Sequence, residues 1–490
     1  MPNPLGRGRS RASSERLGWL LLCLGVVAAF VAPIALDAGG PPPTLSAYHP
    51  SPAQVFASRI SHIVFVVLEN HAFDNYFGQY CRAAGPYCAA AVNGLPAGTC
   101  VPLNVSQPAG ACVRPFPFTA KNWSVTSLMP HNWNSSAQAW NGGLMNGFYS
   151  AEESGFDPFG YYNGTTAPLY WDLAEQYGLG DNFYSSLLDY SLPNHWHIVA
   201  GQAPKEILTH KTGARESTGP NWFQDDRTYL NQANKTKSIE DLLAGTSTPW
   251  SYYEWPLGTY NHAIIDLPNQ TGQAFAYFNP QAAKYESYQP TFINHFVNAT
   301  EFYADARNGT LPSLSWVMPT NNWSDHPPDN STIAQSWTAS LVNAVESSPQ
   351  WSSTAMFIAW DDYGGFYDHV APPNVTGHQL GFRVGFIVVS PYTPQGYVSH
   401  NPYYFESVLH LMEVRFDLGC VTATDCTAPL PYEFFNFTQP ARPPMLFPTT
   451  FSVMHYPMPL QNGTSIGALP PYYPPSNFTL YFGLQAPAQD

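Results

Sequence analysis

The chain has 490 residues, and 44% of them are hydrophobic, which is enough to bury the core of one large domain or of two or three smaller ones. Only 11% are charged, less than half of the usual share of about 25%, and the formal net charge is -15. This acidic balance, with no basic run beyond residue 16, argues against nucleic acid as a partner.

The N-terminus has the organisation of an export segment. Residues 1–16 are basic and predict a cytoplasmic N-terminus, because the positive flank of a membrane segment stays inside. Residues 17–36 are uncharged and apolar, and a helix of this length crosses a bilayer core of roughly 30 Å. They predict a membrane anchor or, alternatively, a signal segment that is cleaved. Residues 37–58, rich in Pro, Ala and Ser, are predicted to be a linker.

Glycosylation sequons and cysteines also predict an extracellular protein. The sequons begin at Asn104, Asn122, Asn134, Asn163, Asn234, Asn269, Asn298, Asn308, Asn322, Asn330, Asn374, Asn436, Asn462 and Asn477. Six cysteines follow the apolar segment, and the simplest of the 15 pairings that six cysteines allow is 81–88, 100–112 and 420–426. No two of them have the CxxC spacing of a zinc site. A glycosylated surface with few carboxylates would suit an acidic exterior.

The first strand signal is followed by a carboxylate and an amide side chain. Residues 62–68 (HIVFVVL) are a near-continuous apolar run, typical of a strand buried on both faces of a parallel sheet. Glu69 and Asn70 follow directly. A carboxylate in this position is often only a helix N-cap or a solvated loop charge. In open α/β sheets, however, ligands bind beyond the carboxyl ends of the strands.

The next chemical signal is Ser191, which precedes a proline and an apolar run and is predicted to lie at a helix N-terminus. Free backbone N–H groups and the helix dipole favour a bound phosphate there. A serine so placed is often only an N-cap. Alternatively, a nearby metal ion would lower the pKa of its hydroxyl and make it a nucleophile.

Strand and helix signals alternate through the rest of the chain, as in an α/β protein. Further buried strands are predicted at 313–318 and 384–389, and helices at 238–244, 290–308, 333–346 and 404–416. A strand at 354–360 (TAMFIAW) is followed by Asp361 and Asp362 and then by a Gly-Gly turn.

The Glu-Asn and Asp-Asp pairs would meet if the strands at 62–68 and 354–360 lie side by side. Glu69, Asn70, Asp361 and Asp362 would then offer an all-oxygen set of ligands to one divalent cation. Such a set permits Ca²⁺, Mg²⁺ or Mn²⁺, and Zn²⁺ as well.

Four motifs in this order resemble one known family. They are residues 62–78 (HIVFVVLENHAFDNYFG), 181–201 (DNFYSSLLDYSLPNHWHIVAG), 324–328 (SDHPP) and 351–373 (WSSTAMFIAWDDYGGFYDHVAPP). They resemble the phosphoesterase family of bacterial phospholipases C and acid phosphatases, over about residues 62–416. The resemblance implies a three-layer α/β/α sandwich of the alkaline-phosphatase-like kind, with a mostly parallel central sheet. It defines a catalytic domain at 59–428, followed at 429–490 by a segment rich in Pro and aromatics that is predicted to wrap over it.

The resemblance also implies roles for single residues. Glu69 and Asn70 match the family's metal-binding pair, and Asp361 and Asp362 match its second acidic pair. Ser191 matches the nucleophilic Ser or Thr of the family.

Three further residues are implied to be catalytic, namely Asn194, His326 and His131, of which the two histidines line the site. Either histidine would hydrogen-bond the phosphoryl oxygens or protonate the leaving group. Asp368 and His369 are equally compatible with a structural role.

Some residues depart from the pattern of many phospholipases C. Ser191 stands in place of Thr, Asp362 in place of Glu and His195 in place of Arg, which is closer to the acid phosphatases, whereas Pro193 is closer to the lipases. Ala137, Asn146, Tyr363 and Phe405 stand where polar or acidic residues are common in the family.

These features predict an exported, metal-dependent hydrolase that forms a phosphoserine intermediate, with an acid phosphatase favoured and a phospholipase C as the alternative. A phosphate monoester or a phospholipid is then the substrate, and the membrane is a partner through the N-terminal segment. Two other hypotheses are a sulfatase of the same fold, against which His195 argues, and a glycosylated surface protein with a decayed site.

Overall fold

The computed structural model of the chain describes residues 50–81, 91–118, 129–151, 155–203, 236–255, 295–319, 323–328, 331–375 and 377–449. None of the helices in these ranges is both long and apolar enough to span a membrane. The predicted membrane segment at 17–36 lies outside the described residues, as do residues 1–16 and most of the predicted linker.

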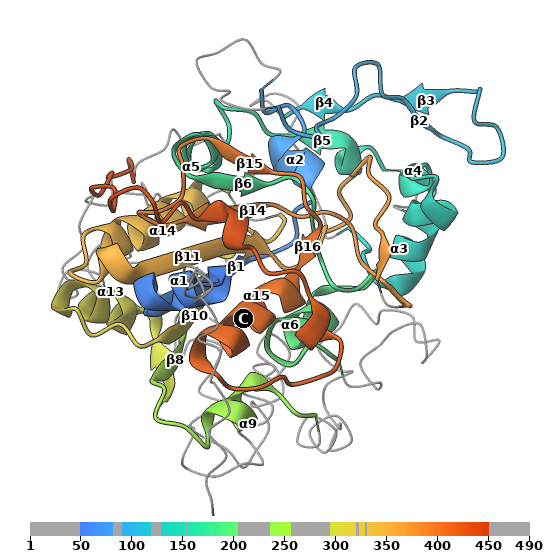
Figure 1. Ribbon diagram of the computed structural model, residues 1–490. Helices are drawn as coiled ribbons and strands as arrows, with labels where there is room; N and C mark the ends of the chain where they lie inside the picture. The colour runs from blue at the N-terminus through green and yellow to red at the C-terminus, as the bar shows by residue number, and fades with distance from the viewer. Residues whose placement is uncertain are drawn as a thin grey trace, which may run out of the picture. The chain divides into compact units, whose positions relative to one another are not determined.

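An eight-stranded sheet forms the centre of the protein, with the order β15-β6-β14-β11-β1-β10-β8-β9 (Figure 1). Its strands are β1 (His62–Leu68), β6 (Gly178–Gly180), β8 (Trp250–Trp255), β9 (Phe296–Asn298), β10 (Leu314–Pro319), β11 (Thr354–Trp360), β14 (Phe386–Val389) and β15 (Tyr397–Ser399). From β11 to β9 all neighbours are parallel, whereas β14 is antiparallel to both β11 and β6. Because β15 is parallel to β6, only β14 runs against the other strands of this sheet. The mostly parallel sheet expected from the sequence is confirmed.

The predicted strands are present, but the direction of one of them was not foreseen. β1, β10 and β11 are buried along almost their whole length and lie parallel at the centre of the sheet. β14 is also completely buried, yet it is antiparallel. A continuous apolar run indicates that both faces of a strand are covered, but it does not indicate the direction of the strand.

Helices cover both faces of the sheet. Phe357 and Trp360 of β11 are three residues apart, so their side chains point to opposite faces. The Trp360 ring lies 4.8 Å from Tyr170 of α5. On the other face the Phe357 ring lies 6.4 Å from Phe435, which in turn lies 5.0 Å from Phe56 of α1. The predicted three-layer α/β/α sandwich is therefore confirmed.

Two groups of helices make up the outer layers (Figure 1). α5 (Pro168–Gln176), α13 (Ala299–Asn308) and α14 (Ser331–Glu346) pack together, and α1 (Pro52–Arg59), α6 (Ser191–Ala200), α9 (Ile239–Leu243) and α15 (Phe405–Phe416) form the other group. The helices predicted at 238–244, 333–346 and 404–416 are confirmed by α9, α14 and α15. The helix predicted at 290–308 begins later, because β9 occupies 296–298 and the Asn298 side chain caps α13 by accepting a hydrogen bond from Thr300 N.

Short elements complete the described chain. They are α2 (Phe73–Phe77), α3 (Trp133–Trp140), α4 (Phe148–Ala151) and the strand pairs β2 (Val101–Pro102) with β3 (Cys112–Val113), β4 (Phe116–Pro117) with β5 (Gly160–Tyr161), β7 (Phe183–Tyr184) with β16 (Tyr403–Tyr404), and β12 (Asn374–Val375) with β13 (His378–Gln379). The described residues also contain five 3-10 turns, at Asn141–Gly143, Asp157–Phe159, Trp351–Ser353, Asp425–Thr427 and Tyr432–Phe434.

Two of the predicted disulfides are confirmed, Cys100–Cys112 and Cys420–Cys426. Cys81 is also disulfide-bonded. Its expected partner at position 88 lies outside the described residues. Beyond residue 428 the described part of the chain contains one 3-10 turn, and Phe434 and Phe447 are buried there.

Candidate active site

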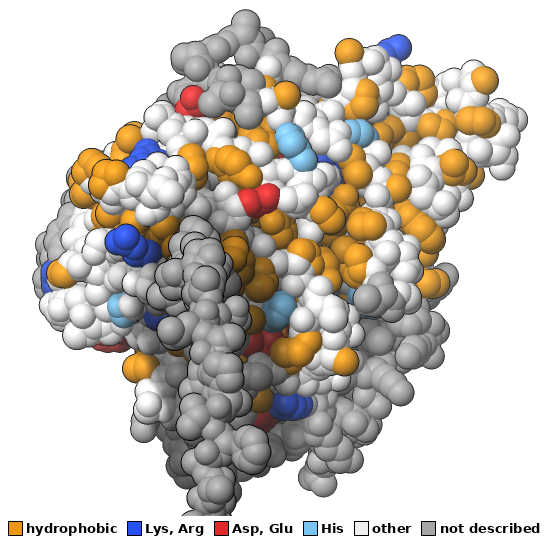
Figure 2. Space-filling view, viewed as in Figure 1, with side chains coloured by type: hydrophobic (Ala, Val, Ile, Leu, Met, Phe, Trp, Pro, Cys, Tyr) orange, Lys and Arg blue, Asp and Glu red, His pale blue; other side chains and the backbone are white. Residues whose placement is uncertain are grey.

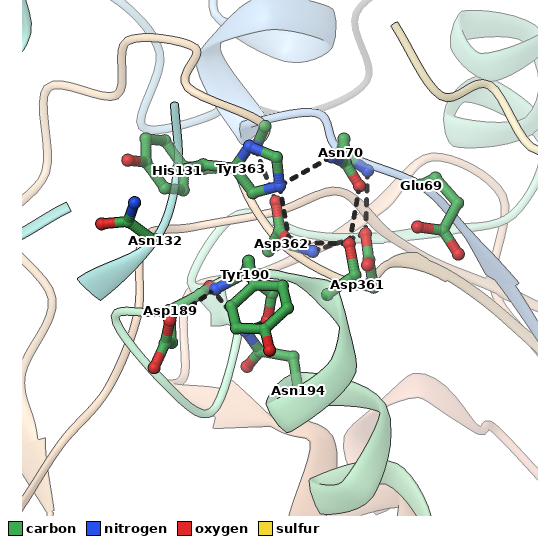
Figure 3. A network of polar contacts seen from close by, with 12 residues as sticks. Glu69, Asn70, His131, Asn132, Asp189, Tyr190, Asn194, Asp361, Asp362 and Tyr363 are labelled. Carbon is green, nitrogen blue, oxygen red and sulfur yellow. Dashed lines mark hydrogen bonds and ion pairs between the residues drawn. The ribbon is translucent and has the colours of Figure 1, made fainter. Parts of the chain in front are cut away.

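The Glu-Asn and Asp-Asp pairs meet at the carboxyl ends of β1 and β11. These strands are neighbours in parallel register, with Leu68 opposite Trp360, so the residues that follow them emerge side by side. The backbone N–H of Asn70 donates to Asp361 Oδ1 at 2.8 Å, and the close-up in Figure 3 shows this loop contact. Glu69 is 5% exposed and the side chains of Asn70, Asp361 and Asp362 are essentially buried. The prediction that the four residues come together is confirmed.

The loop after β1 and the loop after β11 approach each other closely at Asn70 and Gly364. Asn70 has a φ of 62° and Gly364 a φ of 59°, both in the left-handed region. A Cβ atom at Gly364 would lie 2.1 Å from the backbone oxygen of Asn70, so only glycine fits there. The N–H of Gly364 donates to Asp362 Oδ1 at 2.6 Å and thereby holds that carboxylate in place.

Ser191 is the first residue of α6 and points into the same cluster. Its Oγ lies 3.1 Å from Asn70 Oδ1 and 3.2 Å from Asp362 Oδ2. The N-cap position belongs to Tyr190, so Ser191 is not the capping residue of this helix. A hydroxyl in the first turn of a ten-residue helix has free backbone N–H groups around it, and these favour an anion such as phosphate.

His131 and His326 lie on the other side of the Asn70 amide. Their Nδ1 atoms lie 2.7 Å from the backbone oxygens of Met129 and Pro327, respectively. Because a carbonyl oxygen only accepts, Nδ1 carries the proton in each ring, and Nε2 of the neutral ring is an acceptor. Burial lowers the pKa of His326 to about 4, which keeps its ring neutral above that pH. Asn70 Nδ2 lies 3.1 Å from His131 Nε2 and 3.3 Å from His326 Nε2, and donates to both.

The same amide orientation turns Asn70 Oδ1 toward other oxygens. It lies 3.2 Å from Glu69 Oε2 and 3.3 Å from Asp361 Oδ1. The reversed amide would donate to these oxygens, but it would set its own oxygen against the two unprotonated histidine nitrogens. Oxygens this close repel one another unless a proton or a cation lies between them, and a divalent cation bound there would remove the repulsion. Glu69, Asn70 and Asp361 therefore fit the expected divalent cation.

His195 lies against the same two carboxylates. Its Nε2 lies 3.1 Å from Glu69 Oε1 and 3.4 Å from Asp361 Oδ2. Burial lowers the pKa of His195, but the neighbouring Glu69 and Asp361 outweigh it and raise this pKa to about 10. The sequence singled out His195 only as a departure from the family pattern, although its spacing of four residues from Ser191 puts both on one face of α6.

The pKa values of the acidic groups differ strongly. Burial, and then the charge of Asp361, raise the pKa of Glu69 to about 7. Burial also raises the pKa of Asp361, but the hydrogen bond and charge of His195 hold it below the usual range. Burial and the charge of Asp361 raise the pKa of Asp362 well above its ordinary value. Groups whose pKa values are pushed apart in this way are typical of catalytic sites.

Asp362 differs from the other predicted metal ligands in its position. Among the described residues, ligand atoms of Glu69, His195 and Asp361 lie within 4.8 Å of one another, and Asp362 is not in this group. The Asp362 carboxylate instead lies beside Ser191, with His131 Nε2 at 3.9 Å from its Oδ2. Asp362 is thus placed to act on the serine hydroxyl, and its role as a metal ligand stays a prediction.

Asn194 was predicted to be catalytic, and the structure places its side chain against the loop before Ser191. Its Oδ1 accepts from Leu187 N at 2.9 Å, and its Nδ2 donates to the backbone oxygens of Asp189 at 2.9 Å and Tyr190 at 3.2 Å. Asn194 is completely buried. These contacts make it a positioning residue for Ser191, in place of the catalytic residue expected.

A buried aspartate holds the loop that carries His326. Asp325 Oδ2 accepts hydrogen bonds from the hydroxyls of Tyr76 at 2.7 Å and Tyr170 at 3.1 Å, and from Trp360 Nε1 at 3.0 Å. Burial raises the pKa of Asp325 to about 7. The loop is thereby fixed to α2, α5 and the end of β11.

Asp368 and His369, whose role the sequence did not decide, belong to a buried ion-pair network. Arg383 donates from Nε to Asp368 Oδ1 at 2.9 Å and from Nη2 to Asp74 Oδ1 at 3.1 Å. His369 Nδ1 lies 2.6 Å from Asp74 Oδ2. The guanidinium supplies the positive charge among these carboxylates, so the structural role is the better interpretation.

A buried serine beside carboxylates, at the carboxyl ends of parallel strands of an α/β/α sandwich, defines a hydrolytic site of the kind that acts on phosphate esters. A profile of the Phosphoesterase family matches residues 60–419, and the chain belongs to this family. It is accordingly a hydrolase that acts on phosphoric ester bonds.

Curated relatives match most of the chain. Phospholipase C A of Mycobacterium tuberculosis (strain ATCC 25618 / H37Rv) is 27% identical over 88% of this chain and 89% of its own length. Non-hemolytic phospholipase C of Burkholderia pseudomallei (strain K96243) is 26% identical over 73% of this chain and 55% of its own length, so the chain spans about half of that relative. Among solved structures, a protein in the alkaline phosphatase superfamily from Vibrio parahaemolyticus matches 76% of this chain and 71% of its own, with 10% identity and a TM-score of 0.35.

Proposed function

We propose that the chain hydrolyses phosphate esters with Ser191 as the nucleophile, through a phosphoserine intermediate. The observation that carries this proposal is the Ser191 hydroxyl, 4% exposed at the start of α6, with Asp362 Oδ2 at 3.2 Å to take its proton. A divalent cation held by Glu69, Asn70 and Asp361 would supply charge stabilisation for the phosphoryl oxygens.

Each step of the proposed reaction is assigned to a residue of the site. Ser191 Oγ bonds to phosphorus while the bond to the leaving oxygen breaks, and Asp362 takes the hydroxyl proton. His131 in its protonated form gives a proton to the leaving oxygen, whereas His326, whose ring is neutral above about pH 4, can do so only in acid. Both rings are only partly buried and so can reach a substrate. Water then attacks the phosphoserine, and its oxygen replaces Ser191 Oγ on phosphorus. One water proton returns to Ser191, which leaves inorganic phosphate or a phosphorylated head group.

We favour a phosphate monoester as the substrate, as in an acid phosphatase. Two positions where the family often has polar groups carry buried side chains here: Tyr363, whose hydroxyl accepts from Ser136 Oγ at 3.0 Å, and Phe405 at the start of α15. A buried Tyr and Phe leave fewer polar side chains to bind a phospholipid head group.

A phospholipase C is the second candidate, and two observations support it. The relatives reported above carry that name, and large apolar side chains are exposed on the segment that contains His131. Trp133, Leu144 and Phe156 are 38%, 68% and 52% exposed. Hydrophobic side chains gather over the region of α3 and α4 (Figure 2). An apolar surface of this kind suits contact with lipid.

We further propose that the protein is extracellular, glycosylated, and either anchored by residues 17–36 or secreted after their cleavage. The disulfides Cys100–Cys112 and Cys420–Cys426 support an oxidising compartment. Seven sequon asparagines fall in the described residues, and none of them is buried: Asn104, Asn134, Asn163, Asn298, Asn308, Asn374 and Asn436.

The assay that tests the function offers both substrates together. The purified chain is incubated with an aryl phosphate and phosphatidylcholine vesicles, with and without chelator, and the products are followed by phosphorus NMR. Chelator-sensitive inorganic phosphate supports the phosphatase, and phosphocholine supports the phospholipase C. Ser191→Ala is expected to lower turnover by about a hundredfold or more. Ser352→Ala, at an exposed serine before the opposite end of β11, is expected to leave it unchanged. Turnover of neither ester would refute the proposal and favour a sulfatase or a surface protein with a decayed site.

A further inference from the structure

Asp189 lies where the beginnings of two helices meet beside the site. It comes two residues before Ser191, the first residue of α6, and it is 1% exposed. Its Oδ1 accepts a hydrogen bond from Trp133 N at 3.0 Å, and Trp133 is the first residue of α3. The segment that carries the proposed nucleophile is therefore tied to the start of a second helix, which lies 56 residues earlier in the chain.

The start of α3 holds His131, which the proposed reaction places at the leaving oxygen. His131 comes two residues before this helix, and Ser136 Oγ of the helix lies 3.0 Å from the backbone oxygen of His131. The ring is held as well, because its Nδ1 lies 2.7 Å from the backbone oxygen of Met129. A movement of the start of α3 would therefore move the imidazole with it.

The Asp189 carboxylate supplies an acceptor that the start of α3 requires. The first four N–H groups of an α-helix have no partner within the helix. Asn132, the N-cap residue of α3, accepts from Asn134 N at 2.9 Å and from Ser135 N at 3.2 Å. The N–H of Trp133 donates to Asp189. A carboxylate is favoured at this position because it faces the positive end of the helix dipole.

Asp189 is also fixed on the side of α6. Its Oδ1 accepts from Tyr190 N at 3.1 Å, and its backbone oxygen accepts from Asn194 Nδ2 at 2.9 Å (Figure 3). Tyr190 is the N-cap residue of α6, and Asn194 lies in the first turn of that helix. One carboxylate oxygen thus joins the backbone at the start of α6 to the backbone at the start of α3.

We propose that Asp189 is a positioning residue that sets the separation of Ser191 and His131 by joining the starts of α6 and α3. This inference rests on the proposed function, because it assigns a role in the same reaction. The nucleophile and the group at the leaving oxygen act on opposite sides of phosphorus, so their separation matters. A displacement of about 1 Å can lower the rate of an enzyme by about a hundredfold. A residue that only capped α3 would affect stability and not turnover.

The first part of the test changes the acceptor. Asp189→Asn keeps an oxygen with the same reach, and Asn and Asp are about equally good at the start of a helix. Asp189→Leu has a similar size but no acceptor. The constants kcat and KM for nitrophenyl phosphate are measured on the full chain, and circular dichroism checks the fold of each variant.

The second part removes the donor without leaving an unpaired N–H. Trp133→Pro lacks the backbone N–H, and proline is favoured at the first position of a helix. The preceding Asn132 has a φ of -67° and a ψ of 172°, which a residue before proline readily adopts. Trp133→Ala is the matched control, because it also loses the indole but keeps the N–H. The ratio of kcat between these two variants therefore reports the contact with Asp189 alone.

We expect kcat to fall by about tenfold or more in Asp189→Leu, and by a similar factor in Trp133→Pro relative to Trp133→Ala. KM should stay within about threefold, and Asp189→Asn should keep kcat within about threefold of the wild type. If Asp189→Leu does not fold, the two Trp133 variants decide the question. Equal kcat in Trp133→Pro and Trp133→Ala, a rise in KM alone, or an equal loss in Asp189→Asn would overturn the role of Asp189. If the wild-type chain turns over no phosphate ester, the proposed function itself fails, and this role fails with it.

Discussion

Replacing Arg383 by methionine should destabilise the fold severely. The guanidinium is completely buried and donates to Asp368 and Asp74, and also to the backbone oxygens of Asn93 and Asp181 at 2.8 Å each. Removing one partner of a buried ion pair typically costs about 3 to 5 kcal/mol. The two carbonyls that lose a donor add roughly 1 kcal/mol each. Because domains are stable by about 5 to 15 kcal/mol, we expect Arg383→Met to lose a large part of the total, about 5 to 7 kcal/mol.

The assay is urea unfolding at pH 8, followed by tryptophan fluorescence, with Arg383→Lys as the matched variant that keeps the charge. Lysine cannot reproduce the planar set of donors, so an intermediate loss is expected for it. Adding Asp368→Asn to Arg383→Met should restore part of the stability, because it removes one of the uncompensated charges. A loss below about 1 kcal/mol in Arg383→Met, or no recovery in the double variant, would refute the structural role assigned to this network.

Two further predictions concern pH and the loop at Asn70. Burial raises the pKa of Glu346 from 4.5 to about 7. Because the folded chain then holds this proton more tightly than the unfolded chain, the stabilisation is fully present below about pH 4.5 and is lost as the pH rises through 7. Urea unfolding should show that the free energy of unfolding of the wild type falls between pH 4 and 8. In Glu346→Gln this fall should be smaller by up to about 3 kcal/mol. An equal dependence on pH in the two proteins would contradict the prediction. Gly364→Ala should displace Asn70 and weaken divalent-cation binding at least about tenfold in calorimetry, whereas the control Gly377→Ala, which has open space around its Cβ position, should not.

Much of the candidate site could be predicted because it depends on strand order and on motif position. Glu69 and Asp361 follow apolar runs that read as buried strands, and the parallel pairing of those strands brings them together. His195 and Arg383 could not be assigned in the same way. Their roles depend on which side chains face them across the fold, and a single sequence does not contain that information. Asn194 shows the same limit, because its motif position did not reveal that its amide binds the backbone before Ser191.

The fold was predicted best where hydrophobic runs were long. β1 and β11 were found within a residue of their ends, whereas β6 (Gly178–Gly180) has too few apolar residues to signal a strand. α5 (Pro168–Gln176) was missed, although it begins with a proline at N1 and buries Leu169, Tyr170 and Leu173. Its two turns are too short to show a clear helical period in the sequence.

The most direct test of the central claim is to locate the phosphoryl group during turnover. The wild-type chain is mixed with an aryl phosphate, quenched in acid within milliseconds and digested, and the peptides are analysed by mass spectrometry. The account predicts phosphate on Ser191 alone, and none on Ser191→Ala, which also fails to turn over. Phosphate on another residue, or turnover by Ser191→Ala close to that of the wild type, would contradict it.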